Sequence, residues 1–449
     1  MQAAAAIGVL HDGRANFLQV SAQSCIWTLP HGGLEDGKLR PGVRDLGSGG
    51  KHSKGPWVAW RLLTLSDCGS HHGAEHKCEL IDGAVRAGAA AAHDSVRKHV
   101  RFCASDGAAD ARNTGKLYEG INPACAFQVV DPGHYHALVG KWATAGDEEI
   151  ELVEGLLVND KINVAKFLTT SERFRSKFKD ESIKDGLAPL EHFGWAPQRR
   201  SSKARPLRNF TVRLRQIFAA LGIEADNGRT ERRAFAHKVI VELGGVHSDR
   251  LLLAGFLADY RWELFDWITK ADVTNGDVTT LGDDISVLLD RLKLFFDDGW
   301  VLTPQASKTF TGAVLAFLDE RQILHHGSKA IAFEPPTAAR KQAMLNRMRA
   351  VVERTREYIK HYRPEDSWQN RFRAVFRLPS PLLRSGHAGP AAEYTRAEHL
   401  LREICKRGGI DDWNAALQQL KLLAPAVAVR HRAGCDTLEA WGRASADFP

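Results

Sequence analysis

The chain has 449 residues, of which 44% are hydrophobic and 26% charged, and a formal net charge of +7. This composition excludes a largely disordered chain, and the 7 scattered cysteines in a chain of this length exclude a small disulfide-stapled scaffold. Charges interrupt every apolar stretch before it reaches the thickness of a bilayer, and the start lacks the basic region of a secretory signal, so we expect an intracellular protein without a membrane span.

The first part of the chain alternates apolar runs with an alanine-rich segment. Short apolar runs bounded by turn residues indicate strands, and alternation of strands with helices is typical of an α/β layer. The Gly-rich stretch at residues 31–56 is predicted to be a long loop. Strands are predicted at 3–10, 15–29, 57–66, 100–105 and 124–130, and a helix at 74–93.

After about residue 145 the apolar residues recur at helical spacing. Ile285, Leu288 and Leu292 form one such stripe, and Leu345, Met348 and Val352 lie on another, which predicts helix faces that point into a core. Beyond the helices, "FRAVFRL" at 372–378 is predicted to be a short strand stopped by prolines, with helices after it. The predicted segments are 1–146, 147–362 and 363–449.

Two aspartates, Asp12 and Asp106, each follow a short apolar run and precede a glycine. Metal-assisted phosphoryl transfer needs carboxylates that converge on one or two divalent ions, and strand ends commonly hold such ligands. Asp-Gly is also a common turn dipeptide. The stretch "DPGHYHAL" adds Asp131 and His134, and Asp-Pro-Gly likewise opens ordinary turns. The spacing alone does not distinguish a metal site from ordinary turns at these positions.

A compact cysteine and histidine cluster lies in "DCGSHHGAEHKC", with Cys68, His71, His76 and Cys78 as candidate zinc ligands. The spacing differs from the usual pair of cysteines followed by a distant pair of histidines. His76 and Cys78 are two apart on the expected helix, so their side chains do not face one another. Zinc binding and a solvated loop before a helix both fit this stretch.

A basic run without acids extends from residue 196 to 215 in "APQRRSSKARPLRNFTVRLR". Arginine pairs bidentately with phosphate, so this run is a candidate contact with a nucleic-acid backbone; a solvated charged face is the alternative. The candidate residues are Arg199, Arg200, Lys203, Arg205 and Arg208.

The order of these features resembles the catalytic domain of the hAT superfamily of cut-and-paste DNA transposases and of host proteins domesticated from them. "SDGAADA" is similar to the family's strand-ending acid, with Asp106 in that position, and "DPGH" is similar to its C/D-x-x-H motif, with Asp131 and His134. Asp12 is the best match to the acid of the first strand. The final catalytic glutamate is not placed, and Glu353, Glu357 and Glu398 stay open.

The resemblance implies an α/β plus α fold: a ribonuclease-H-like mixed-sheet core with a large all-helical insertion and a helical C-terminal segment. It also implies DNA as the partner, a nuclear location and a homo-oligomer. In an active relative Asp12 and Asp106 would hold Mg²⁺ or Mn²⁺ for strand cleavage and transfer, and Asp131 and His134 would support them. A degenerate relative would keep DNA binding without catalysis. The alternative is a non-catalytic helical interaction protein of unrelated role.

Overall fold

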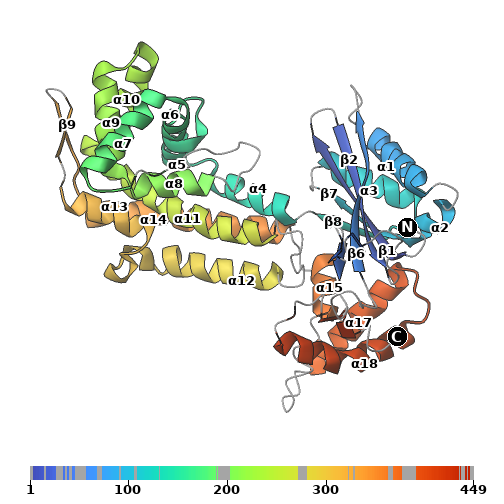
Figure 1. The fold of residues 1–449 in the computed structure, drawn as a ribbon. Coiled ribbons are helices and arrows are strands. Elements are labelled where there is room, and N and C mark those ends of the chain that lie inside the picture. The colour runs from blue at the N-terminus through green and yellow to red at the C-terminus, as the bar shows by residue number, and fades with distance from the viewer. Residues whose placement is uncertain are drawn as a thin grey trace. The chain divides into compact units, whose positions relative to one another are not determined.

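The computed structural model divides into two compact units, which we describe separately (Figure 1). Unit 1 comprises Met1–Tyr135, Asn275–Gly282 and Arg363–Pro449, and unit 2 comprises His136–Thr274 and Asp283–Tyr362. The first and last segments predicted from the sequence thus fall largely in one unit. The structure describes the chain except residues 1–3, 15–16, 27–33, 36–37, 40–42, 46–56, 68–72, 90–92, 106–108, 131, 189, 191–202, 272–280, 322, 327–328, 363–367, 377–390, 434, 436–439, 442 and 445–449.

Unit 1 is built on a six-stranded sheet with the strand order β5-β6-β2-β1-β7-β8. Its strands are β1 (Ala4–Arg14), β2 (Phe17–Ile26), β5 (Val43–Asp45), β6 (Trp57–Asp67), β7 (Val100–Ser105) and β8 (Phe127–Val130). Two further short strands, β3 (Leu34–Glu35) and β4 (Lys38–Leu39), pair with each other. The stretch 31–56, predicted to be a loop, therefore contains three short strands.

The strands of this sheet run in both directions. β2 is antiparallel to β1 and β6, and β5 is antiparallel to β6, whereas β7 and β8 run parallel to β1. Leu10 pairs with Ala104, and Ser105 pairs with Val130, so the carboxyl ends of β7 and β8 lie side by side and next to β1. The strands predicted from the sequence in this region are present and share one sheet.

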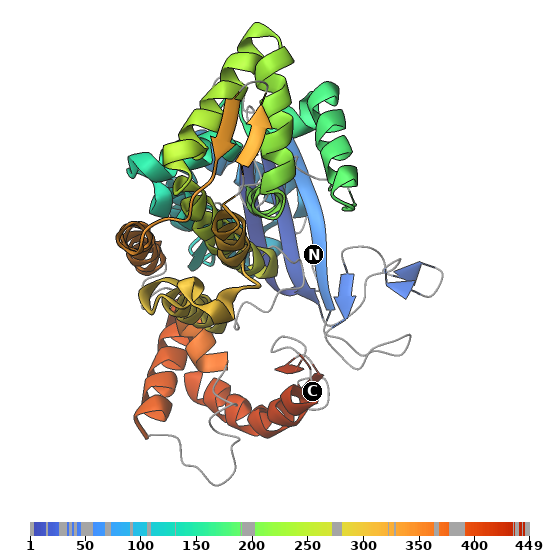
Figure 2. The same ribbon diagram turned by 90° about the vertical axis from the view of Figure 1, so that its left-hand side faces the viewer.

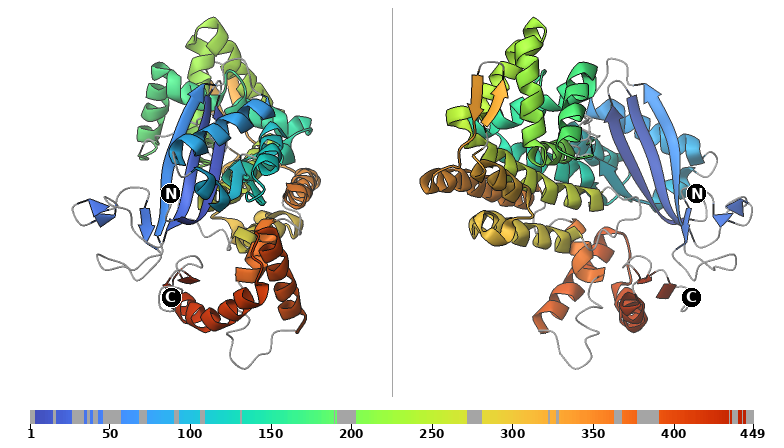
Figure 3. Two further views of the ribbon diagram at one scale, coloured as in Figure 1. Left: turned by 90° about the vertical axis from the view of Figure 1, so that its right-hand side faces the viewer. Right: turned by 60° about the vertical axis from the view of Figure 1, so that its left-hand side comes forward.

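Helices cover both faces of the β7–β8 end of the sheet. Phe102 and Phe127 stack with ring centroids 5.3 Å apart, and Phe372 of α15 (Trp368–Phe376) packs on both rings at 5.7 and 5.1 Å. Gln128, the next residue of β8, instead donates a hydrogen bond to the carbonyl of Gly115 in α3 (Ala109–Ile121). Because alternate strand residues point to opposite faces, α15 and α3 lie on opposite sides of the sheet. Figure 3 shows α1 (Ala74–Ala89) with α3 on the same side.

The predicted strand at 372–378 is wrong, because its described residues form the second half of α15. Phe372, Val375 and Phe376 are spaced three and four apart, which places them on one face of a helix. Val375 is fully buried in a cluster with Phe127. The alternation of arginine and apolar residues in "RFRAVFR" imitates a strand, but burial of the helical face decides the structure. The remaining helices of unit 1 are α2 (His93–His99), α17 (Ala391–Arg407) and α18 (Trp413–Arg432).

Unit 2 is a bundle of helices that wrap around the long helix α11 (Arg250–Ala271). α4 (Pro132–Thr144) crosses into it from unit 1. Its other α-helices are α5 (Glu148–Glu154), α6 (Val164–Thr170), α7 (Glu172–Lys184), α8 (Ala204–Thr211), α9 (Leu214–Asn227), α10 (Thr230–Leu243), α12 (Leu281–Leu292), α13 (Phe310–Asp319) and α14 (Ala338–Tyr362). Single turns lie at η2 (Gly155–Asn159), η4 (Gly245–His247), η5 (Lys293–Asp297), η6 (Trp300–Leu302) and η7 (Pro304–Ala306).

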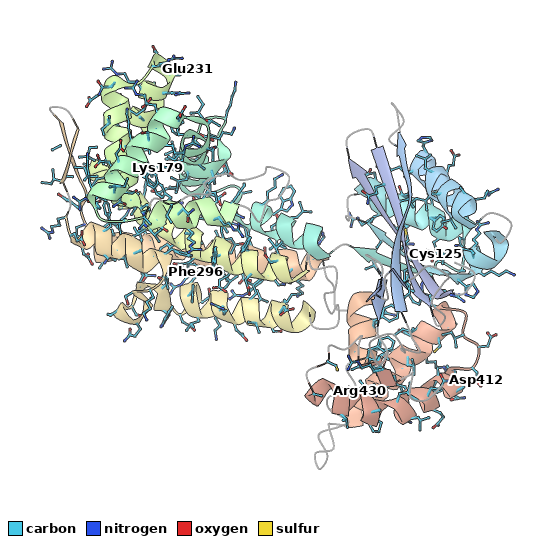
Figure 4. All side chains as sticks on the ribbon, viewed as in Figure 1. Cys125, Lys179, Glu231, Phe296, Asp412 and Arg430 are labelled. Atoms are coloured by element: carbon cyan, nitrogen blue, oxygen red, sulfur yellow. The ribbon has the colours of Figure 1, made fainter. Side chains whose placement is uncertain are left out.

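The predicted core-facing stripes of these helices are confirmed. Leu288 and Leu292 are buried in α12, and Met348 and Val352 are buried in α14. Phe296, labelled in Figure 4, meets Phe256 of α11 edge to face, with centroids 5.9 Å apart and planes at 88°. Edge-to-face contact is the favoured geometry for paired aromatic rings. The apolar stripes thus face a core, as their helical spacing predicts, and Phe296 joins that core to α11.

Unit 2 is not all-helical. A β-hairpin of β9 (Ile323–His326) and β10 (Lys329–Ala332) packs against α9 (Figure 2). Ile331 of β10 is buried, and Phe333, which follows the hairpin, is fully buried between the rings of Phe218 and Phe317. The short run "ILHHGSKAIAF" is too brief for its period to separate strand from helix, which is why the sequence missed the hairpin.

The predicted fold class, a ribonuclease-H-like α/β core with an all-helical insertion, needs correction. Helices rather than strands make up most of the described chain, and the insertion contains the β9–β10 hairpin. Unit 2 buries a helical core of its own around α11, so the sheet organises only a part of the chain. We therefore do not retain a ribonuclease-H-like classification. Among the described residues, no helix is long and apolar enough to cross a membrane.

A buried carboxylate fixes α13 on α11. Asp259 accepts hydrogen bonds from the backbone N–H groups of Phe310 and Thr311 at 3.0 and 2.9 Å and from the Thr311 hydroxyl at 2.6 Å. Burial raises the pKa of Asp259 to about 6, and the hydrogen bonds from Thr311 and Phe310 oppose this rise. At neutral pH the carboxylate is therefore charged and satisfies donors of the first turn of α13, which have no partner inside that helix.

Replacing Asp259 by alanine should lower the free energy of unfolding by about 1–3 kcal/mol, because it leaves buried N–H donors without an acceptor. Chemical denaturation followed by circular dichroism measures this loss. The matched control is Asp298→Ala, which removes an exposed carboxylate from the same unit and should change stability little. Equal effects of the two substitutions would contradict the capping role.

Candidate nucleic-acid interface

The basic run of the sequence forms α8, and its buried residues determine which side chains face solvent. Pro206 and Leu207 are buried, and so is Phe210, one turn further on. Arg205 and Arg208 are exposed and lie three apart, which places them next to each other on the outer face of the helix. The apolar residues at the intervening positions anchor α8 and hold the two arginines at the surface.

Both arginines lie over aromatic rings of α11, on which α8 packs (Figure 1). The guanidinium carbon of Arg208 lies 5.0 Å from the ring centroid of Trp262, and that of Arg205 lies 5.6 Å from the centroid of Phe265. Both distances are within the range of a cation–π interaction, which needs a cation within about 6 Å of the ring. The contact holds each guanidinium in a defined place.

The two rings form one continuous surface. Trp262 and Phe265 stack with centroids 5.4 Å apart and planes inclined by 26°. Phe310 of α13 supports Trp262 edge-on at 5.9 Å. Trp262 and Phe265 are half-buried, whereas their neighbours on α11 are mostly buried. We refer to Arg205, Arg208, Trp262 and Phe265 as the arginine–aromatic platform.

The carboxylates near the platform have other partners. Glu263 is buried and accepts a contact from Arg291 at 2.8 Å. Asp266 is exposed next to Phe265 and has interactions of its own. Within the described part of the chain, neither Arg205 nor Arg208 forms an ion pair with a carboxylate. Since guanidinium groups stay protonated at any physiological pH, the platform presents two positive charges to an external anion.

The other basic residues of the run have different surroundings. Arg213 donates to the carbonyl of Ala188 at 3.3 Å, and Arg215 forms an ion pair with Asp185 at 3.5 Å. These two arginines therefore connect the start of α9 to the end of α7. Lys203 stands at the N-cap position of α8 without a side-chain capping bond, and it has interactions elsewhere. Arg199 and Arg200 lie outside the described residues.

The predicted catalytic acids are only partly described. Asp12 lies inside β1 and pairs with Gln19 of β2, so the strand continues two residues past it instead of ending there. Asp106 and Asp131 lie outside the described residues. His134 lies in the first turn of α4, which begins at Pro132. In the described part of the chain, no group of three His, Cys, Asp or Glu side chains could hold a metal ion.

The three candidates for the final glutamate lie in both units. Glu353, on α14 in unit 2, pairs with Arg356 at 2.8 Å, and Glu357 is exposed on the same helix. Glu398 is on α17 and pairs with Lys421 of α18 at 3.0 Å. Of the three, Glu398 alone belongs to the same unit as Asp12. None of the three belongs to a group of three possible metal ligands among the described residues.

The candidate zinc cluster gains no support from its described members. Cys78 is buried in α1, and burial raises the pKa of its thiol to about 11, which disfavours the thiolate that zinc requires. His76 is half-exposed, and its ring nitrogen lies 3.9 Å from the carboxylate of Glu79. Cys68 and His71 lie outside the described residues.

Neither a family model, nor a curated protein, nor a solved structure matches the chain. The resemblance to hAT transposases therefore stays a prediction from short motifs, and the candidate site depends on its own geometry.

Sequence reasoning found the arginines of the platform but missed its rings. Trp262 and Phe265 lie on α11 in "RWELFDWI", a stretch that predicts a buried helix. Nothing in the sequence pairs them with α8, because the contact joins positions more than fifty residues apart. The available signal is their spacing of three on a helix whose residues 251–258 are all apolar, where two large rings need a neighbouring element to cover them.

Proposed function

We propose that the protein binds nucleic acid through the arginine–aromatic platform of unit 2. One observation carries the proposal: Arg205 and Arg208 are exposed, lie over aromatic rings and have no carboxylate partner in the described chain. Arginine is suited to phosphate because its planar group donates two parallel hydrogen bonds. The net charge of +7 also favours a polyanionic partner.

This role agrees with the DNA partner that the hAT resemblance implies. The same resemblance implies a nuclear location and a homo-oligomeric state. We include both in the proposal, although the geometry of the platform supports neither. The alternative is a helical interaction protein whose partner is another protein. The two alternatives differ in salt dependence, because displacement of counterions from a nucleic-acid backbone gives a steep dependence on salt concentration.

Replacing Arg205 and Arg208 together by alanine should weaken duplex DNA binding by roughly tenfold and reduce the slope of log K against log salt by about two. Each lost phosphate contact removes one released counterion, whatever the base sequence. Fluorescence anisotropy with a labelled duplex, titrated at several salt concentrations, measures both quantities.

The control is Arg173→Ala with Arg175→Ala, which removes the same charge from exposed positions of α7 in the same unit. We expect this variant to keep most of the affinity. If both double variants lose affinity equally, binding depends on overall charge and not on the platform.

A second candidate function is metal-dependent cleavage of the bound nucleic acid. The parallel strands favour it, since Ser105 and Val130 end β7 and β8 in register and Ala104 pairs with Leu10 of β1. In the sequence, Asp106 and Asp131 follow these two strand ends, and carboxylate oxygens suit Mg²⁺ and Mn²⁺. Such a pair of acids would make unit 1 the catalytic part of an hAT-like protein.

Under this second proposal, the full chain binds Mn²⁺ weakly, and Asp12→Asn with Asp106→Asn lowers the affinity at least about tenfold, because two ligands are lost. Isothermal titration calorimetry gives the affinities. Asp411→Asn, at an exposed position of the same unit, controls for the change in charge and should bind like the wild type. Equal Mn²⁺ affinity in all three proteins would contradict a metal site at Asp12 and Asp106.

A further inference from the structure

The arginine–aromatic platform offers more than charge. The distances of 5.0 and 5.6 Å place the guanidinium carbons of Arg208 and Arg205 over their rings, so one side of each group is turned toward a ring. Because both arginines are exposed, the side of each guanidinium away from its ring is available to a ligand. The rings hold the two guanidinium groups in place, so a flat ligand group finds a partner that is already positioned.

Nucleic-acid bases are flat groups attached to an anionic chain. An unpaired base stacks on an arginine plane or an aromatic ring, and this contact tolerates every base because each has a π-face. In a duplex the faces of the bases are covered by their neighbours, and only base edges reach the grooves. Of the two strand forms, the single strand can therefore use the outward faces of Arg205 and Arg208.

The spacing of the arginines also fits a single strand. Residues three apart on a helix have Cβ atoms about 5–6 Å apart, whereas successive bases of one strand in a duplex are separated by about 3.4 Å along the axis. Two neighbouring bases reach both arginines only when the strand is extended beyond its stacked form. Positive charge at each position also neutralises the phosphates that accompany the bases.

We infer that the arginine–aromatic platform binds unpaired bases of single-stranded nucleic acid by stacking on the guanidinium planes of Arg205 and Arg208. This inference rests on the proposed nucleic-acid binding and adds the strand form and the mode of contact. A carboxylate-rich protein partner would use the donors at the edges of the same arginines and would leave their faces unused.

The test compares two strands of equal length and charge, an oligothymidine and an oligomer of abasic sites, by fluorescence anisotropy with the full chain. Stacking predicts at least about fivefold tighter binding to the oligothymidine, since a stacked base adds to the phosphate contacts. The variant Arg205→Lys with Arg208→Lys keeps both charges but removes both planes. It should lose the preference for oligothymidine, and its affinity for the abasic strand should fall less than its affinity for oligothymidine, because both charges remain.

The matched control is Arg173→Lys with Arg175→Lys on α7, which should leave both affinities unchanged. Equal binding of oligothymidine and abasic strand by the wild type would overturn the inference and leave the proposed phosphate contact intact. A preference that survives the lysine substitutions would also overturn it. Failure to bind either strand and the duplex would overturn both the inference and the proposed function.

Discussion

The burial of α11 is the constraint on which unit 2 depends. All ten residues from Leu251 to Tyr260 are buried, so every side of this half of the helix needs a packing partner. α8, α13 and α14 supply partners, and the apolar residues of α8 bring it against α11. The platform lies in the second half of α11, where Trp262 and Phe265 are only half-buried. The arginines of α8 cover rings that would otherwise be exposed to water, and their stems and planes are suited to that cover.

Polar residues inside the same helix are paired, which makes α11 a well-defined support. Arg261 donates to Glu154 through Nε at 2.8 Å and also contacts the Thr144 hydroxyl at 2.9 Å. Glu263 pairs with Arg291, and Asp259 caps α13. Removing one partner of a buried charge pair costs about 3–5 kcal/mol, so these contacts strongly favour one arrangement of the helices. The rings of the platform therefore lie on a helix that polar contacts fix to several neighbouring helices.

Much of the fold could be predicted from the sequence, because most segments have one clear period. The stripes through Leu288 and Met348 gave the helices of unit 2, and the apolar runs gave β1, β2, β6, β7 and β8. Prediction failed where local pattern and burial disagree. "FRAVFRL" alternates like a strand but places Phe372 and Phe376 against the sheet as a helix. The predicted fold class was wrong because helices make up most of the described chain, and unit 2 buries a helical core of its own around α11.

The candidate site was predictable only in part, for a physical reason. A run of arginines without acids is a local signal, and it marked Arg205 and Arg208. Their orientation over Trp262 and Phe265 is a tertiary contact between separate helices, and the sequence contains no local trace of it. The predicted acids were also found from local motifs. Of these, the structure describes the strand that contains Asp12, whereas Asp106 and Asp131 lie outside the described residues.

Ultraviolet cross-linking of the full chain to an oligothymidine, followed by trypsin digestion and mass spectrometry, tests most directly whether the platform contacts nucleic acid. Trypsin cleaves after Arg261 and Lys270 and releases the peptide "WELFDWITK", which contains both rings of the platform. We expect thymidine adducts on this peptide or on the segment of α8 that carries Arg205 and Arg208, and their loss in the variant Arg205→Ala with Arg208→Ala. Efficient cross-linking confined to other peptides would contradict the assignment of the platform as the nucleic-acid interface.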